Sequence, residues 1–163
     1  MNIRPLSPAD APELAALRAR NHAFLAPFEP HRPDDFATEA GQAAWIESGG
    51  GIRFAILDGG AIAGTISLSD IVRGPLQRAS VGYWVAKEHN GRGLASRALA
   101  DLVDYAFGEL ELHRLEAGTM LDNLASQRVL RRNAFTEIGV SRQHLLIAGA
   151  WRDHLLFERL APG

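Results

Sequence analysis

The sequence predicts an α+β fold with a mixed sheet, and three features of the chain indicate it. Two apolar runs, Ile52–Leu57 and Ala61–Leu68, flank the turn Asp58-Gly59-Gly60 and read as a hairpin. A strand, a glycine-rich loop and an amphipathic helix follow one another over Ser80–Gly108. A second apolar hairpin, turned at Gly149, ends the chain. An antiparallel meander is therefore expected to precede a right-handed helical crossover, which joins parallel strands.

The first elements are a strand over Asn2–Leu6 and a helix that begins with Ser7 as its N-cap and continues to about Arg20. A second helix is expected over Asp35–Ser48. The three prolines of the intervening segment, Asn21–Asp34, exclude a regular helix or a central strand there.

That proline-rich segment has the composition of a stiff binding loop, with apolar anchors and a few polar groups. Its candidates for substrate contact are Phe24, Phe28, Glu29 and His31. The alternative is a connector whose phenylalanines cap the core, and the sequence leaves both interpretations open.

The later elements alternate between strands and helices, with about four helices in the whole chain. They are a loop over Asp70–Gln77, a strand over Ser80–Val85, a helix over Ala95–Ala106, a strand over His113–Thr119, a helix opened by Asn123, a strand over Phe135–Val140, a mobile loop over Ser141–His144, and a hairpin of Leu145–Ile147 with Trp151–Leu160.

Length and composition limit the class of protein. The 163 residues are expected to form one domain, residues 1–163, and the lack of cysteine excludes disulfides and cysteine nucleophiles. A net charge of −2 gives no footprint for nucleic acid. No apolar run approaches the roughly 20 residues of a membrane span, and no signal peptide is evident. We expect a cytoplasmic protein that acts without membrane or metal.

The loop between the central strand and helix predicts an anion site, because a helix N-terminus offers unpaired N–H groups and a favourable dipole. A P-loop is excluded, since no Gly-Lys-Ser/Thr is present. The dinucleotide fingerprint is nearly matched by Gly91-x-Gly93-x-x-Ser96, with Glu116 about 20 residues on. Against it, Ser96 replaces the third glycine, and five residues separate Val85 from Gly91.

A third pattern, Gln/Arg-x-x-Gly-x-Gly/Ala, reads here as Asn90-Gly91-Arg92-Gly93-Leu94-Ala95, with Asn90 departing at the first position. This segment resembles the acetyl-CoA-binding motif of the GNAT acetyltransferase superfamily, and the order of elements is similar to that fold. Further segments resemble its ribosomal-protein-alanine N-acetyltransferase group. They are Asn21–Pro30, Gly82–Val85, Asn123–Leu130, Phe135 and Trp151–His154.

The resemblance implies a GNAT-type sheet whose parallel strands splay apart, and it assigns roles to residues on either side of the gap. The backbone of Trp84 and Val85 would bind the pantetheine arm of acetyl-CoA, and the Val85 N–H would hold the oxyanion. Asn123 would contact the cofactor arm, and Ser126 would donate to the thioester sulfur. The pyrophosphate would lie on the N–H groups of the loop, with Arg92 and Lys87 adding charge; the loop residues are Asn90, Gly91, Arg92, Gly93, Leu94, Ala95 and Ser96.

The acceptor implied by the resemblance is the N-terminal α-amine of a protein such as a ribosomal protein. The alternatives are a small amine (a polyamine, an aminoglycoside or an amino acid) and a non-catalytic acyl-CoA-binding module. Candidates for the general base are Glu29, His31, Asp70 and His144, whereas His154, like His22 and His113, is assigned a structural role. A monomer and a homodimer both remain open.

Overall fold

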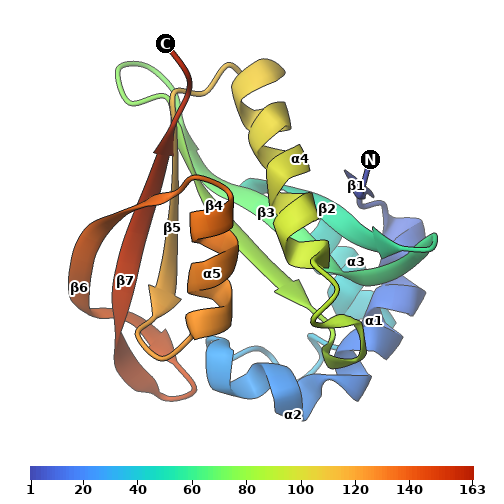
Figure 1. Ribbon diagram of the computed structural model, residues 1–163. Coiled ribbons are helices and arrows are strands. Elements are labelled where there is room, and N and C mark those ends of the chain that lie inside the picture. Colours follow the sequence, from blue (N-terminus) through green and yellow to red (C-terminus); the bar gives the residue numbers. More distant parts are fainter.

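The computed structural model describes residues 1–163 and contains one seven-stranded sheet with five α-helices (Figure 1). The strands are β1 (Ile3–Pro5), β2 (Gly51–Asp58), β3 (Ala61–Val72), β4 (Arg78–Val85), β5 (Arg114–Met120), β6 (Thr136–Ile147) and β7 (Ala150–Leu160). The helices are α1 (Ala11–Arg20), α2 (His22–Leu25), α3 (Glu39–Glu47), α4 (Leu94–Gly108) and α5 (Leu124–Arg132). Three 3-10 turns lie at Pro8–Asp10, Ala26–Phe28 and Lys87–His89.

The strand order β1-β2-β3-β4-β5-β7-β6 confirms the predicted mixed sheet. Every neighbouring pair is antiparallel except β4 and β5, the two strands that α4 connects. The parallel pairing covers only Arg78–Ser80 against Arg114–Glu116. Beyond it the two strands run on without pairing, which confirms that they splay apart.

Helices cover both faces of the sheet. The large core lies under α4 and α5, where the apolar stripe of α4 is almost completely buried, with Leu99 and Leu102 both 0% exposed. Burying a leucine stabilises the fold by roughly 1.5–3 kcal/mol. On the opposite face, Leu14 and Leu17 of α1 form a smaller core with the sheet and α3. None of the helices combines the length and the apolar character needed to cross a membrane.

The proline-rich segment departs from its prediction, since it contains the one-turn helix α2 and thereby raises the number of helices from four to five. The helix is compatible with the prolines because all of them follow it. Pro27 lies at the start of the 3-10 turn Ala26–Phe28. The first N–H groups of a helical turn make no hydrogen bond within the turn, so the N–H that proline lacks is not needed there.

Two other element boundaries also differ. The second predicted helix begins at Glu39 rather than Asp35, because Thr38 caps it by accepting a hydrogen bond from the Gly41 N–H at 3.1 Å. Strand β3 extends to Val72, through the start of the predicted loop, by means of a register shift after Ser69. A bulge of this kind lets a strand continue where the sequence suggests a turn.

The predicted mobile loop at Ser141–His144 is wrong, because these residues belong to the continuous strand β6. The ladder shifts register between Ser141 and Leu145. Gln143 takes a φ of +47° there, and its N–H donates to a carboxylate oxygen of Asp153 on β7 at 2.8 Å. A side-chain acceptor thus replaces a missing ladder bond, which the polar composition alone did not reveal.

Candidate active site

The chain leaves β4 at Val85, makes a 3-10 turn and enters α4 through two glycines in the left-handed region. Gly91 has a φ of +78°, and Gly93, the N-cap of α4, has a φ of +73°. No acceptor within the chain takes the backbone N–H groups from Gly91 to Ser96, and the first helical bond is Arg97 N–H to the Gly93 carbonyl. These N–H groups border a cavity of about 340 Å³ between the loop, α4 and α5. The loop therefore has the free donors of an anion site.

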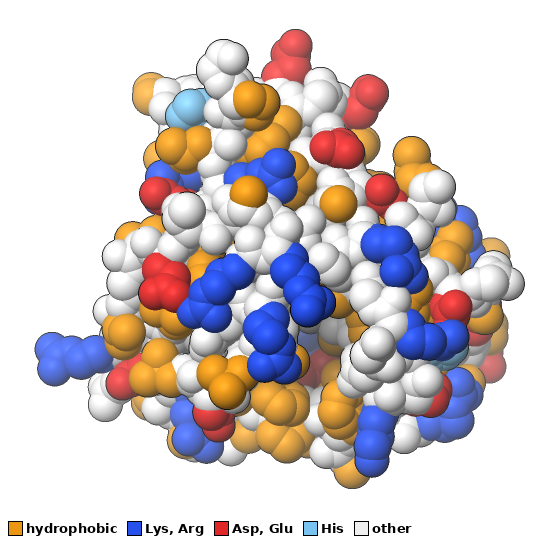
Figure 2. Space-filling view, viewed as in Figure 1, with side chains coloured by type: hydrophobic (Ala, Val, Ile, Leu, Met, Phe, Trp, Pro, Cys, Tyr) orange, Lys and Arg blue, Asp and Glu red, His pale blue; other side chains and the backbone are white.

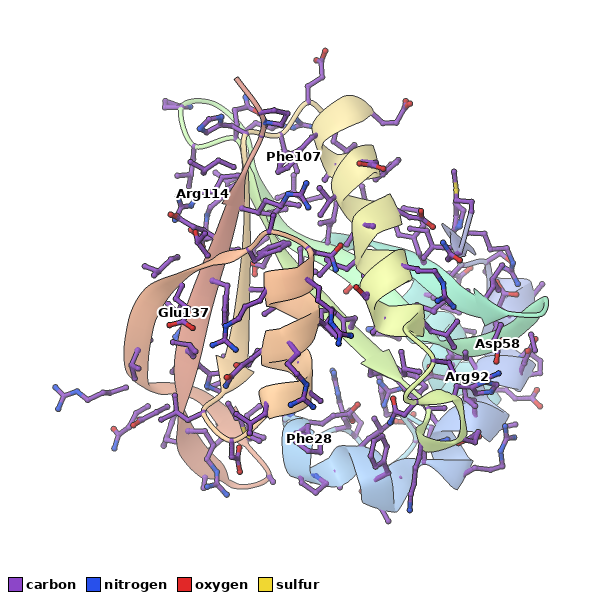
Figure 3. The ribbon with its side chains drawn as sticks, viewed as in Figure 1. Phe28, Asp58, Arg92, Phe107, Arg114 and Glu137 are labelled. Atoms are coloured by element: carbon purple, nitrogen blue, oxygen red, sulfur yellow. The ribbon has the colours of Figure 1, made fainter.

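The positive charge beside this cavity comes from α5 rather than from the loop. Arg128 and Arg132, one helical turn apart and both exposed, line it. Figure 2 shows basic side chains gathered over α5 and its border with α4. Arg92, which the sequence assigned to this role, instead contacts the carboxylate of Asp58 in the β2–β3 hairpin (Figure 3). Lys87 is not among the lining residues.

His89 completes a small charged cluster with Arg92 and Asp58. Its Nδ1 atom lies 2.7 Å from the same Asp58 oxygen and 2.7 Å from the Arg92 guanidinium. The hydrogen bond from His89, together with the charge of Arg92, lowers the pKa of Asp58 below its usual value. The loop before α4 is thereby tied to the β2–β3 hairpin.

The gap between β4 and β5 holds a second cavity, of about 160 Å³. It is lined from both faces of the sheet: by Tyr83 and Thr119 on the face of α5, and by Gly82 and Gly118 on the opposite face. Phe28, next to α2, also lines it, and Figure 3 shows Phe28 close to the start of α5. The cavity therefore lies within the gap in the sheet and is bordered by residues of both faces.

Backbone alternation decides which groups of β4 face this gap. The Ala86 N–H donates to the Ala63 carbonyl of β3 at 2.8 Å. Because successive strand residues direct their backbone groups to opposite sides, those of Trp84 also face β3, whereas those of Val85 face away from it. A Cβ added to Gly64 would lie 2.0 Å from the Trp84 carbonyl oxygen, which agrees with that direction. The sequence assigned the backbone of both Trp84 and Val85 to the pantetheine arm. In the structure only Val85 directs its N–H and C=O away from β3, whereas those of Trp84 are directed toward β3.

Asn123 and Ser126 lie in the first turn of α5. The Asn123 side-chain oxygen accepts the Ser126 N–H at 3.2 Å, as an N-cap does. The Ser126 hydroxyl oxygen lies 2.8 Å from the hydroxyl of Tyr83 on β4, and both residues line the gap. Burial raises the pKa of Tyr83 to about 12, so its hydroxyl stays protonated. A pair of hydroxyl donors therefore lies beside the gap.

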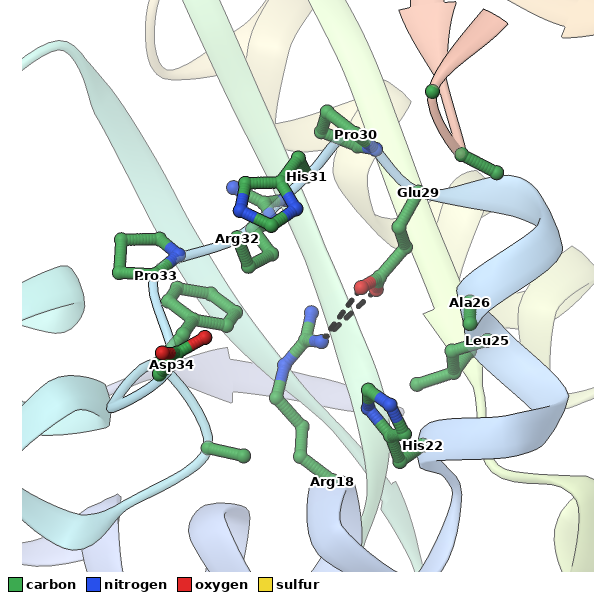
Figure 4. A pocket seen from close by; sticks show the side chains of 14 residues that line it. Arg18, His22, Leu25, Ala26, Glu29, Pro30, His31, Arg32, Pro33 and Asp34 are labelled. Carbon is green, nitrogen blue, oxygen red and sulfur yellow. Dashed lines mark hydrogen bonds and ion pairs between the residues drawn. The ribbon is translucent and has the colours of Figure 1, made fainter.

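A third cavity, of about 590 Å³, opens on the other face of the sheet, between α1, α2, the following loop and the β6–β7 turn (Figure 4). Its wall contains a partly buried ion pair in which the buried Arg18 donates to both oxygens of Glu29, at 2.9 and 3.2 Å. Burial lowers the pKa of Arg18, and the charge of Glu29 opposes that shift. The Arg18 guanidinium also lies 4.9 Å from the Trp84 ring, so the Trp84 side chain supports this cavity.

The predicted acceptor residues divide between the cavities. Glu29 and His31 line the cavity of 590 Å³, and Phe28 lines the gap. Phe24 lines neither, and its ring packs 6.5 Å from that of Phe28. The Ala148 N–H donates to the Glu29 carbonyl at 3.0 Å, so the β6–β7 turn holds this segment in place.

Sequence reasoning missed Tyr83, Arg18, Arg128 and Arg132. The two α5 arginines follow Asn123 in a helix whose start was predicted, so their spacing was an available signal. Nothing local in the sequence pairs Tyr83 with Ser126, which lie 43 residues apart.

Comparison with known proteins gives consistent matches. A family model described as "Acetyltransferase (GNAT) domain" matches residues 1–136. "Probable N-acetyltransferase YjcK" of Bacillus subtilis is 40% identical over 98% of this chain and 93% of its own length. The ribosomal protein uS5-alanine N-acetyltransferase of Escherichia coli is 31% identical over 98% of this chain and 87% of its own.

Among solved structures, "Mycobacterium smegmatis RimJ in complex with CoA-disulfide" superposes with a TM-score of 0.93 and 31% identity, covering 98% of this chain and 81% of that one. These matches confirm the predicted superfamily and the resemblance to ribosomal-protein-alanine N-acetyltransferases. The chain belongs to the GNAT family of N-acetyltransferases.

Proposed function

We propose that the protein transfers the acetyl group of acetyl-CoA to the N-terminal α-amine of a protein, such as a ribosomal protein. The observation that carries this proposal is the run of free N–H groups from Gly91 to Ser96 beside the cavity of 340 Å³. Such donors at a helix N-terminus bind phosphate groups well. Arg128 and Arg132 add the charge that the anionic cosubstrate needs.

Acetyl-CoA supplies an acetyl group that its thioester activates toward an amine. The residues of the gap fit the two changes of charge that transfer requires. The Val85 N–H, which faces away from β3, would donate to the carbonyl oxygen as that oxygen gains negative charge. The protonated Tyr83 hydroxyl would donate to the Ser126 hydroxyl oxygen, which at 2.8 Å is nearer than the Ser126 carbonyl at 3.2 Å. This leaves the Ser126 O–H free to donate to the departing sulfur.

The acceptor side favours a peptide N-terminus over a polycation. The cavity of 590 Å³ carries balanced charge, with Arg18 and Arg32 against Glu29 and Asp34. A polyamine or an aminoglycoside would be better matched by an excess of carboxylates. An α-amine is also partly neutral near pH 7, because its pKa is roughly 7.7–8.0, against about 10.4 for lysine.

The direct test is a thiol-release assay with acetyl-CoA and a panel of amines. The panel contains peptides with N-terminal alanine or serine, the same peptides with a blocked N-terminus and an internal lysine, spermidine and an aminoglycoside. We expect release with the free N-terminal peptides only. Preference for spermidine or the aminoglycoside would assign the protein to small amines. Binding of acetyl-CoA without release from any amine would indicate a non-catalytic module.

The role of Ser126 is tested by Ser126→Ala. We expect kcat to fall about 10- to 100-fold, because proton transfer to the sulfur is lost, while the Kd for acetyl-CoA changes less than about twofold. Ser69→Ala, on the distant part of β3, is the matched control and should leave both constants unchanged. An equal loss in kcat and in affinity would make Ser126 a binding residue only.

A further inference from the structure

His154 on β7 is a buried histidine that the roles described so far do not use. It is 4% exposed, and it lines the cavity of 160 Å³ together with Ser126 and Tyr83. Buried polar side chains in proteins normally have a full set of partners. The only hydrogen bond of its ring runs from Nδ1 to the Arg152 carbonyl, at 3.0 Å, so Nε2 has no partner within the chain.

The side chain of His154 approaches the gap from the face opposite to Ser126. His154 is paired with Met120 of β5, so the two side chains lie on one face. Ala117 of β5, which faces the other way, packs in the core beneath α4 and α5. Gly118 borders the gap and has no side chain, and a Cβ added to it would lie 3.7 Å from the His154 ring. The His154 ring therefore covers Gly118.

The hydrogen bond to the backbone also defines the tautomer of the ring. A carbonyl oxygen can only accept, so Nδ1 of His154 carries the proton in the bond to the Arg152 carbonyl. Nε2 of the neutral ring then has a free lone pair. His144 is the imidazole packed against it, with ring centroids 5.4 Å apart, and its own Nδ1 contacts the Ser141 hydroxyl at 2.9 Å.

We propose that His154 is the general base that takes the proton from the acceptor amine. This assignment rests on the proposed acetyl transfer and deepens it. It replaces the structural role that the sequence suggested for His154. The amine would enter from the face of α1 and α2, opposite to the loop that binds the pyrophosphate, and would meet Nε2 at the gap.

The other candidate bases are less suitably placed. Both oxygens of Glu29 are engaged by Arg18. Asp70 follows the part of β3 that pairs with Ser80, at the far end of β4 from Val85. His31 is exposed at the wall of the larger cavity, His144 is exposed on β6, and neither of them lines the gap.

The proton balance of the reaction closes with these groups. The amine nitrogen forms a bond to the acetyl carbon, and its proton moves to Nε2 of His154. The bond from carbon to sulfur breaks with its electron pair on sulfur, which takes a proton through the Ser126 hydroxyl. Ser126 and His154 then exchange protons with solvent, so the products are the acetylated amine and the free thiol of coenzyme A.

The test compares His154→Gln and His154→Asn with the wild-type protein, using a peptide with N-terminal alanine and acetyl-CoA. The Asn amide can still donate to the Arg152 carbonyl, and the Gln amide places a polar group near the Nε2 position, but neither amide accepts a proton. We expect kcat/KM to fall about 100-fold in both variants, with the Kd for acetyl-CoA within about twofold of wild type. His113→Gln, in the exposed turn before β5, is the control and should keep wild-type rates.

Chemical rescue separates catalysis from packing. Imidazole added to His154→Ala should restore turnover, and more basic imidazoles should restore it more, as a proton acceptor requires. Nitrogen-15 NMR of the wild-type protein provides a measurement that needs no variant: His154 should carry its proton on Nδ1.

Several outcomes would overturn the assignment. Wild-type rates in both amide variants would do so, as would rescue independent of basicity or an Nε2–H tautomer at His154. If kcat/KM fell in His144→Gln but not in the His154 variants, the general base would be His144. Inactivity of the wild-type protein toward every amine would overturn the proposed function together with this assignment, whereas the first four results would leave acetyl transfer intact.

Discussion

The cavities on the two faces of the sheet are built in different ways. The cavity of 340 Å³ is formed by one loop, the start of α4 and one side of α5, and its donors are mainly backbone N–H groups. The cavity of 590 Å³ is assembled from α1, α2, the segment before α3 and the β6–β7 turn, and its polar groups are side chains. A site made of backbone keeps its chemistry through most substitutions, whereas a site made of side chains changes with each one. We therefore expect the cavity of 590 Å³, the proposed acceptor side, to determine specificity.

The largest expected effect comes from Gly93→Asp in the cavity of 340 Å³, the proposed cofactor side. Gly93 has a φ of +73°, and a Cβ there would lie 3.2 Å from the Arg97 guanidinium. A non-glycine residue in the left-handed region costs about 1–2 kcal/mol, and the added carboxylate repels a phosphate at the same donors. We expect the Kd for acetyl-CoA to rise more than about 100-fold by calorimetric titration, with the fold retained.

Gly49→Asp is the matched control, because no atom lies within 4 Å of a Cβ at Gly49 and its backbone is outside the left-handed region. Unchanged affinity in Gly93→Asp would mean that acetyl-CoA does not bind at this loop.

The acceptor side is tested by Glu29→Gln, which leaves the Arg18 guanidinium, 7% exposed, without a counter-charge. Breaking a fully buried pair costs roughly 3–5 kcal/mol, but Glu29 is only partly buried and the amide can still accept, so we expect the free energy of unfolding to fall by about 2 kcal/mol. Urea unfolding measures it. The KM for a peptide acceptor should rise several-fold, while the Kd for acetyl-CoA stays constant.

Glu47→Gln, at the exposed end of α3, controls for loss of a surface charge. A parallel change in the Kd for acetyl-CoA would show that the two sides of the sheet are not independent.

The difference between a cavity formed by one loop and a cavity assembled from distant segments also explains how much of the site the sequence predicted. The loop Asn90–Ser96 and the start of α5 at Asn123 are each contiguous in the chain, so local patterns predicted these elements and the anion site expected at the loop. Tyr83 and Ser126 meet only because α5 packs over β4, and His154 reaches the gap only because β7 pairs with β5. Such contacts depend on tertiary packing, which no local pattern contains.

Substitutions of Arg92, Arg128 and Arg132 test whether the positive charge at the proposed acetyl-CoA site comes from the loop or from α5. Arg128→Ala and Arg132→Ala should each raise the Kd for acetyl-CoA about fivefold, since an exposed charge contact contributes about 1 kcal/mol. Arg92→Ala should change it less than about twofold, because Arg92 is bound to Asp58. Titrations at low and high salt measure the difference, which should shrink as salt screens the charges.

Arg142→Ala, on the exposed strand β6, is the control for general loss of positive charge. A larger rise in the Kd for acetyl-CoA in Arg92→Ala than in Arg128→Ala would mean that the loop, and not α5, contacts the phosphates.

The smallest effect concerns Asp58, the side chain that ties the backbone-built loop to the β2–β3 hairpin. Its pKa is lowered from 3.8 by the hydrogen bond from His89 and by the charge of Arg92, so its ionised form is favoured in the folded protein. A lowered folded-state pKa stabilises the fold above the unfolded-state pKa, and this contribution is lost as the pH falls through the folded-state value. Asp58→Asn should therefore lower the urea midpoint slightly at pH 7 and match the wild type only at pH values below the lowered folded-state pKa of Asp58, which lies under 3.8. Asp104→Asn, on the exposed side of α4, should not reproduce this pattern. A difference between Asp58→Asn and wild type that persists at acid pH would instead mean that the substitution acts through packing of the hairpin and not through the ionised carboxylate.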